Sequence, residues 1–178
     1  AQAELVQLEF AEALCLPDEQ YQHLYFPLTA FISLIAKLPG HPPLEMGLVG
    51  YEGMLGVTIL LQTRQVPSEA IVQGAGLAWR FPVSVFEAAL AQSEHLAPLL
   101  RVYMYLLLRQ LNKNAVCAHF HQVEARLARW LLMSHDRIQT DELYLTHQFL
   151  AEMLGVRRSG GRGRVPVRDA LGHERPRP

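Results

Sequence analysis

The sequence predicts an α+β fold in three parts: an antiparallel β domain, a long helix and the beginning of a helix-turn-helix. Three observations support this prediction. Short apolar segments separated by turn residues occupy the chain up to about Pro82. A stretch without glycine, in which apolar residues have helical spacing, then extends to about Ile138. Residues 145–159 finally have the spacing of a helix-turn-helix.

The N-terminal part alternates strand-forming and turn-forming segments. Aromatic and β-branched residues, which favour strands, are dense in the segment HLYFPLTAFISLIAKL. The turn cluster PGHPP follows at 39–43, and glycines alternate with apolar residues in LEMGLVGYEGMLGVTILL and EAIVQGAGLAWRFP. Regular turns between short strands are typical of an antiparallel sandwich or barrel rather than of βαβ units.

Two helices are expected after these strands. Ser84 and Glu87 form a capping box that would begin the first helix, and Pro98 suits the first turn of the second. The second helix is apolar on more than one side, so one side can pack on its own domain while another packs on a partner helix. We therefore expect a homodimer, the alternative being a helix buried within a monomer. The residues expected at the dimer interface are Leu99, Tyr103, Leu106, Leu107 and Leu111.

The segment LTHQFLAEMLGVRRS has the features that a helix-turn-helix requires. Thr146 is expected to cap the first helix, and Leu150, Ala151 and Leu154 to form its inner face. Gly155 suits a turn with left-handed backbone, and the residues after it would open a recognition helix that reaches phosphates and base edges. The alternative is an ordinary amphipathic helix ending in Gly-Val. The expected DNA-binding residues are Thr146, His147, Arg157, Arg158 and Ser159.

Five segments, taken in chain order, resemble the Crp/Fnr family of bacterial transcription regulators: YFPLTAFISL, EMGLVGYEGMLGV, IVQGAGLAWRFP, AVCAHFHQVEARLARWLL and LTHQFLAEMLGVRRS. The resemblance extends over nearly all of the chain up to Ser159. It implies a cyclic-nucleotide-binding-like β-roll of jelly-roll type at 1–90, a dimerisation helix at 91–116 and a winged helix-turn-helix at 117–178. It also implies DNA and a second copy of the chain as partners, RNA polymerase as a further candidate partner, and a cytoplasmic location.

The sequence departs from this family at the ligand site. Nucleotide-binding members carry a glycine-glutamate pair that holds the ribose and a later arginine-serine pair that holds the cyclic phosphate. The matching places here read Gly56-Val57 and QVPSEA at 65–70, with Arg64 just before the second. Val57 has no carboxylate for a ribose hydroxyl, and a phosphate would lose its water without gaining a charge-assisted partner. We therefore expect an unknown effector other than a cyclic nucleotide.

The C-terminal tail also departs from the family. Gly161 stands where the family has a branched apolar residue, and Gly160, Gly163 and Pro166 also disfavour a continuing recognition helix. We expect no wing strands and an incomplete domain after about residue 159, caused by a truncation or a shifted reading frame. The alternative is an arginine-rich arm, since residues 157–178 carry a net charge of +5 against −6 for the rest. For the whole chain, the alternative to a regulator is a DNA-inactive remnant or a purely regulatory β-roll dimerisation module.

Other functions receive no support from the residue pattern. Cys15 and Cys117 lie far apart, which argues against a disulfide framework and fits a reducing compartment. His119 and His121 would face different ways on a helix, so we expect no metal and no cofactor. No nucleophile elbow, P-loop or pair of catalytic carboxylates is present, so we do not expect an enzyme. Trp79 and Trp130 are expected in the core, and no apolar run has the length of a membrane span.

Overall fold

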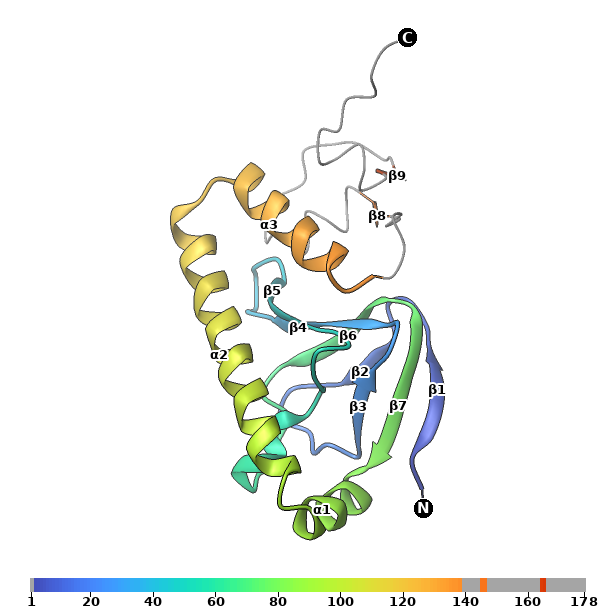
Figure 1. Cartoon of the computed structure of the whole chain (residues 1–178). Helices are drawn as coiled ribbons and strands as arrows, with labels where there is room; N and C mark the ends of the chain where they lie inside the picture. Colours follow the sequence, from blue (N-terminus) through green and yellow to red (C-terminus); the bar gives the residue numbers. More distant parts are fainter. Residues whose placement is uncertain (1, 139–144, 147–163, 166–178) are drawn as a thin grey trace.

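The computed structural model of the protein describes residues 2–138, 145–146 and 164–165 (Figure 1). Its N-terminal part consists of two antiparallel sheets. The first has the order β1-β7-β3, formed by Glu4–Leu8, Gly76–Pro82 and His23–Pro27. The second has the order β2-β6-β4-β5, formed by Ala13–Cys15, Glu69–Gly74, Phe31–Ala36 and Leu44–Val49. The predicted antiparallel β domain is therefore confirmed.

Strand β4 explains why the segment FISLIA is almost continuously apolar. Ile32 and Leu34 point into the main core between the sheets, together with residues such as Leu24, Val49 and Val72. Phe31 and Ile35 point to the opposite face and belong to a second apolar cluster beneath a helix. A strand covered on both faces lacks the alternation of a half-exposed strand.

Gly56 occupies a turn that requires glycine. It precedes the short 3₁₀ helix η1 (Val57–Leu61) and has a φ of 93°, in the left-handed region. A Cβ placed there would lie 2.3 Å from Cδ2 of Leu24, a fully buried side chain. Conformation and packing therefore both exclude a side chain at this position.

Three helices follow: α1 (Val83–Gln92), α2 (Leu96–Phe120) and α3 (Val123–His135). Pro98 lies in the first turn of α2, as predicted. The predicted capping box at Ser84 is wrong, because α1 begins at Val83 and its N-cap is Pro82, with no side-chain capping bond. The backbone N–H of Val83 instead donates to the carbonyl of Gln22, so the β domain itself satisfies the helix start.

Helix α2 covers the open edge of the second sheet, where β5 is the last strand. The Gln110 side chain binds both backbone groups of Leu48: its Oε1 accepts from the N–H at 2.5 Å and its Nε2 donates to the carbonyl at 3.1 Å. Asn114 donates to the carbonyl of Met46 at 2.8 Å. A Cβ on Gly47 would lie 2.9 Å from Leu111, so glycine permits this close approach. The helix thereby satisfies edge groups that would otherwise face solvent.

Helix α3 packs on the outer face of the second sheet, above β4 and β5 in Figure 1. Trp130 and Leu131 are buried there against Phe31, Ile35 and Leu48. The prediction that Trp130 is a core residue is therefore confirmed.

The prediction that Trp79 is also a core residue is wrong, because this side chain is 40% exposed. It lies on β7 directly opposite Leu5 of β1, and Leu5 is also exposed. The neighbouring Ala78 takes the inward position of the alternating strand.

The C-terminal part contains a short strand pair that the sequence did not predict. Strands β8 (Leu145–Thr146) and β9 (Arg164–Val165) pair antiparallel, with Thr146 opposite Arg164. An extended Thr146 is compatible with an N-cap, whose backbone is normally in the β region. The other expected DNA-binding residues, His147, Arg157, Arg158 and Ser159, lie outside the described residues, as do the tail glycines and Pro166. Among the described helices, none is long and apolar enough to cross a membrane.

Candidate functional site

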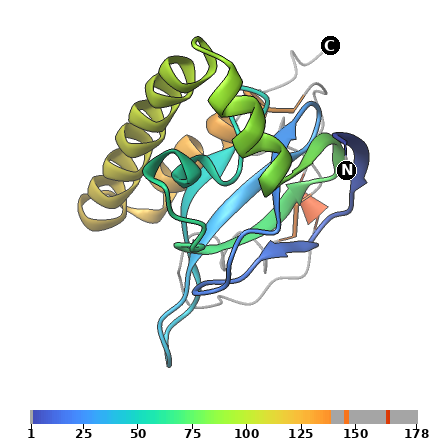
Figure 2. The ribbon, with the colours of Figure 1, turned by 90° about the horizontal axis from the view of Figure 1, so that it is seen from below.

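Helix α2 carries exposed apolar side chains along its length. One long side of this helix faces away from the β domain (Figures 1 and 2). Starting at Leu99, residues spaced alternately by three and four positions form one stripe, which we call the outer seam. Its members are Leu99, Val102, Leu106, Arg109, Lys113, Val116 and Phe120. The apolar members are each at least half exposed, with Phe120 at 73% and Leu99 at 67%. Tyr105 and Leu108 extend the exposed apolar surface beside it.

The residues predicted for the dimer interface lie on two different sides of α2. Leu99 and Leu106 belong to the outer seam. Tyr103 is buried in the core of the same chain, where its hydroxyl donates to the carbonyl of Met54 at 3.3 Å. Leu107 and Leu111 are half-buried, and Leu107 packs against the same core. Tyr103 is therefore buried within its own chain, whereas Val102, Val116 and Phe120, which were not among the predicted interface residues, are exposed on the outer seam.

The two positions compared above with the nucleotide contacts of the family, Val57 and Arg64, both make contacts within the chain. Val57 is buried in the main core. Arg64 donates from Nε to Glu87 of α1 at 3.1 Å and forms an ion pair with the same carboxylate. Tyr103 approaches so closely that a Cβ on Gly53 would lie 1.9 Å from its ring. Helix and β domain are thus in direct contact at this place.

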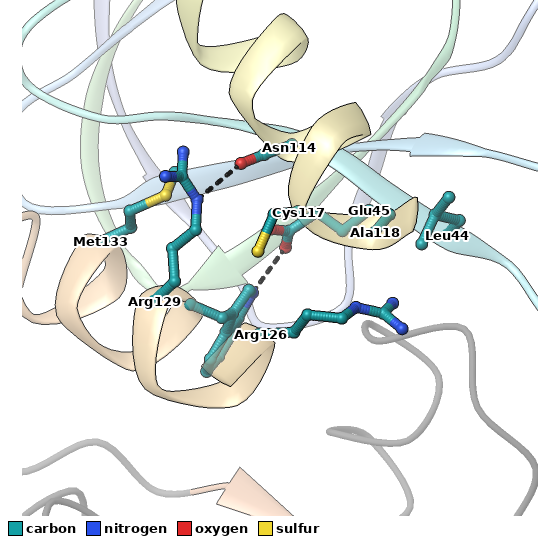
Figure 3. Close-up of a pocket in the computed structure, with 9 residues that line it drawn as sticks. Leu44, Glu45, Asn114, Cys117, Ala118, Arg126, Arg129 and Met133 are labelled. Atoms are coloured by element: carbon teal, nitrogen blue, oxygen red, sulfur yellow. Dashed lines mark hydrogen bonds between the residues drawn. The ribbon is translucent and has the colours of Figure 1, made fainter. Parts of the chain in front are cut away.

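A buried carboxylate lies where α3 meets the sheet. The Oε2 atom of Glu45 on β5 accepts from the Ser33 hydroxyl at 2.6 Å and from the Trp130 indole N–H at 3.0 Å. We call these three residues the Glu45 cluster. Burial raises the pKa of Glu45 to about 7, although the two hydrogen bonds and the charge of Arg137 act to lower it. Glu45 also lines a small cavity between α2, α3 and β5, in which the bond from α3 to its carboxylate can be followed (Figure 3).

Further polar contacts join α3 to its surroundings. Arg129 donates from Nε to Oδ1 of Asn114 on α2 at 3.1 Å, the second dashed line in Figure 3. Just beyond the helix, Arg137 donates from Nε and Nη2 to Oε1 of Glu52 at 2.9 and 2.6 Å. Helix α3 is therefore held both by the sheet and by α2.

Metal and thiol chemistry find little support in the described part of the chain. His121 Nδ1 lies 3.3 Å from Cys117 Sγ, but no group of three or more potential metal ligands occurs among the described residues. Burial raises the pKa of the Cys15 thiol to about 11, so this thiol is protonated at neutral pH.

Comparison with known proteins gives one family match for part of the chain. The family model described as a Crp-like helix-turn-helix domain matches residues 125–160, which begin within α3. No curated protein matches the chain significantly in sequence.

Solved structures match nearly the whole fold at low sequence identity. FixK2 from Bradyrhizobium japonicum is 16% identical with a TM-score of 0.71, over 88% of this chain and 79% of that one. A Crp-family transcriptional regulator from Thermus thermophilus is 16% identical with a TM-score of 0.67, over 85% and 77%. A second regulator of the Crp/Fnr family from the same organism is 15% identical with a TM-score of 0.68, over 94% and 98%. The fold inferred from the sequence is thereby confirmed, and the two Thermus thermophilus proteins are described as transcriptional regulators.

Proposed function

We propose that this chain, a Crp/Fnr-type regulator in its fold and its helix-turn-helix sequence, acts as a homodimeric DNA-binding transcription regulator. The proposed parts are a sensor at 1–90, a dimerisation helix at 91–116 and a DNA-binding domain at 117–178. Helix α2 and its outer seam continue past the second boundary to Phe120. Thr146, His147, Arg157, Arg158 and Ser159 are the proposed DNA contacts. RNA polymerase is a proposed further partner, and the cytoplasm is the proposed location.

The outer seam is the observation that carries this proposal. One long side of α2 is bound to its own β domain through Gln110 and Asn114, while another side exposes apolar residues in heptad spacing. A second copy of α2 offers the same stripe, and a two-fold axis along the helices makes the two surfaces self-complementary. The same axis would place the two helix-turn-helix sequences in symmetric positions, as a palindromic operator requires.

Two cationic members of the seam set the conditions for pairing. Arg109 and Lys113 occupy its middle, and α2 contains no Asp or Glu. In a parallel pair these cations would lie near their counterparts in the second copy, which costs stability but fixes register. The apolar members at both ends of the seam would provide the attraction.

The effector is proposed to be something other than a cyclic nucleotide. Val57, buried in the core, offers no carboxylate to a ribose, and Arg64 is paired with Glu87. Calorimetry with cyclic AMP and cyclic GMP is expected to detect no binding at micromolar concentrations. Micromolar affinity for either nucleotide would contradict this part of the proposal.

Sedimentation velocity of the full chain at micromolar concentration tests the dimer. We expect a dimer for the natural sequence and a monomer for Leu106→Glu, which places a charge in the seam. Leu61→Glu is the matched control, because Leu61 is an exposed leucine outside α2, and it is expected to remain dimeric. A monomeric natural chain, or equal effects of both substitutions, would contradict the seam as the dimer interface.

DNA binding separates the regulator from the alternative, a regulatory β-roll dimerisation module or DNA-inactive remnant. The arginines of residues 157–178 provide salt-dependent attraction to phosphates in either case. Competition against random DNA with promoter fragments of the source genome distinguishes the two. A dimer without preference for any fragment would favour the module.

A further inference from the structure

The contact between α3 and the sheet is unusually polar for a buried interface. The buried polar residues among those described are Ser33, Glu45, Glu69, Gln73 and Ser134. The first four come from neighbouring strands β4, β5 and β6, and Ser134 lies on the buried side of α3 with Trp130 and Leu131. A permanent apolar core has no need of such groups, which cost free energy wherever their hydrogen bonds are incomplete.

The hydrogen bonds at this interface are in fact incomplete. Within the described part of the chain, Gln73 Nε2 and Ser134 Oγ are buried without a hydrogen-bond partner. The Glu45 carboxylate has two donors, Ser33 and Trp130, but neither carries a formal charge. An interface of this kind is held less firmly than the main core, and its strength depends on the state of Glu45.

We propose that Glu45 is a positioning residue that holds α3 on the sensor through Trp130, and that its protonation controls how firmly the helix-turn-helix sequence is docked. The inference rests on the proposed function, because it gives the docking of α3 a regulatory meaning. It adds a specific contact, from a sensor strand to the first helix of the matched Crp-like segment.

The charge state of Glu45 has a defined direction of effect. Burial raises its pKa to about 7, whereas an undocked, solvated Glu45 would titrate near its usual value of 4.5. The docked state therefore binds the proton more tightly. Docking is firmest below pH 4.5, weakens as the pH rises from there to about 7, and changes little above that. Between pH 6 and 8, this linkage predicts that the undocking equilibrium increases by about tenfold.

Other charged groups around Glu45 do not reverse this direction. From α3, Arg126 and Arg129 line the same cavity, and Arg137 beyond its end lowers the pKa but pairs with Glu52. From α2, Cys117 is the titratable neighbour. The groups that face Glu45 from β4 and β6 are the uncharged Ser33 and, next to it, Gln73. On the same sheet, Glu69 is paired with Lys37.

Hydrogen–deuterium exchange of the full-length chain tests the inference without using DNA. Exchange of peptides covering α3 is measured at about pH 6 and about pH 8, normalised to the intrinsic exchange rate. In the natural chain we expect opening of α3 to increase by about tenfold between these values. In Glu45→Gln, which keeps an acceptor for Trp130 but cannot ionise, we expect no such increase. Peptides covering β7 serve as an internal reference and should show no pH dependence in either chain.

Two further variants complete the test. Glu69→Gln removes a buried carboxylate on the same sheet that pairs with Lys37, and it should retain the response of α3 to pH. Trp130→Phe keeps the aromatic packing but removes the donor, and it should raise α3 exchange at both pH values. Equal pH responses in the natural chain and Glu45→Gln, or loss of the response in Glu69→Gln, would overturn the inference. Failure of the proposed function would instead be seen as a monomer or as absent DNA binding, with the exchange results unaffected.

Discussion

The two sides of α2 should respond to mutation in opposite ways, and the pair Tyr103→Ala and Leu106→Ala tests this directly. Tyr103 is 8% exposed in the core of its own chain, whereas Leu106 is 50% exposed on the outer seam. We expect Tyr103→Ala to lower the free energy of unfolding, and Leu106→Ala to weaken dimerisation without lowering the stability of the monomer.

The magnitudes follow from the burial of each side chain. Truncating a buried aromatic residue costs about 3–5 kcal/mol, and loss of the bond to the Met54 carbonyl is included in that cost. Covering the exposed half of Leu106 in a dimer is worth about 1 kcal/mol per copy. Because each dimer contains two copies, Leu106→Ala should weaken association by about 2 kcal/mol, or roughly thirtyfold.

Urea unfolding at several protein concentrations and sedimentation equilibrium measure the two quantities separately. Leu106→Ala should change the dissociation constant alone, after the concentration dependence of unfolding is taken into account. If Tyr103→Ala weakened the dimer while leaving the monomer's stability unchanged, Tyr103 would face a partner, and the orientation of α2 described above would be wrong.

Three further predictions follow from single contacts. Lys113→Leu should tighten the dimer several-fold, as measured by sedimentation equilibrium. Raising the salt concentration from about 0.05 to 0.5 M should tighten the natural dimer more than this variant, and a natural dimer weakened by salt would contradict like-charge repulsion in the seam. Glu45→Gln should stabilise the chain by up to about 3 kcal/mol at pH 8 and by almost nothing at pH 4.5, since the raised pKa of Glu45 makes its ionised form costly only at high pH. Urea unfolding at both pH values measures the free energy of unfolding of the two chains, and the same difference between them at both pH values would refute the prediction. Gly56→Ala should cost about 2 kcal/mol or more in a thermal or urea melt, because of its left-handed backbone and the buried Leu24 side chain above it, and a neutral effect would show that the turn can relax.

The sequence predicted the classes of the elements better than the faces they bury. Strand β4 and the long glycine-free helix follow from composition and spacing, which depend on local chemistry. The side of α2 that faces inward does not follow from the sequence, because apolar residues lie on most sides of this helix. The polar pair Gln110 and Asn114 held the missing signal, since polar residues on an apolar helix face often bind a neighbouring backbone.

The Glu45 cluster could not be predicted from the sequence. A glutamate inside the apolar strand LEMGLV gives little indication of burial, because a strand normally alternates between solvent and core. Its donors come from Ser33 and from Trp130, which is 85 positions away in the sequence. A contact of this range depends on how α3 packs on the sheet, and local pattern does not contain that information. Trp79 is the opposite case, because its large apolar ring predicts burial but lies partly exposed.

Strand β5 links the two contacts on which the proposed regulation depends. It carries Glu45 for α3, and it presents the backbone groups of Met46 and Leu48 to α2. The bonds to α2 use backbone and amide groups that do not titrate, so a change of pH does not act on these bonds directly. The bond to α3 ends on a carboxylate whose charge changes near neutral pH. Loss of the proton from Glu45 would therefore release α3 relative to β5 and α2, and a reference that stays in place is what a sensor needs to pass a local change to a DNA-binding domain.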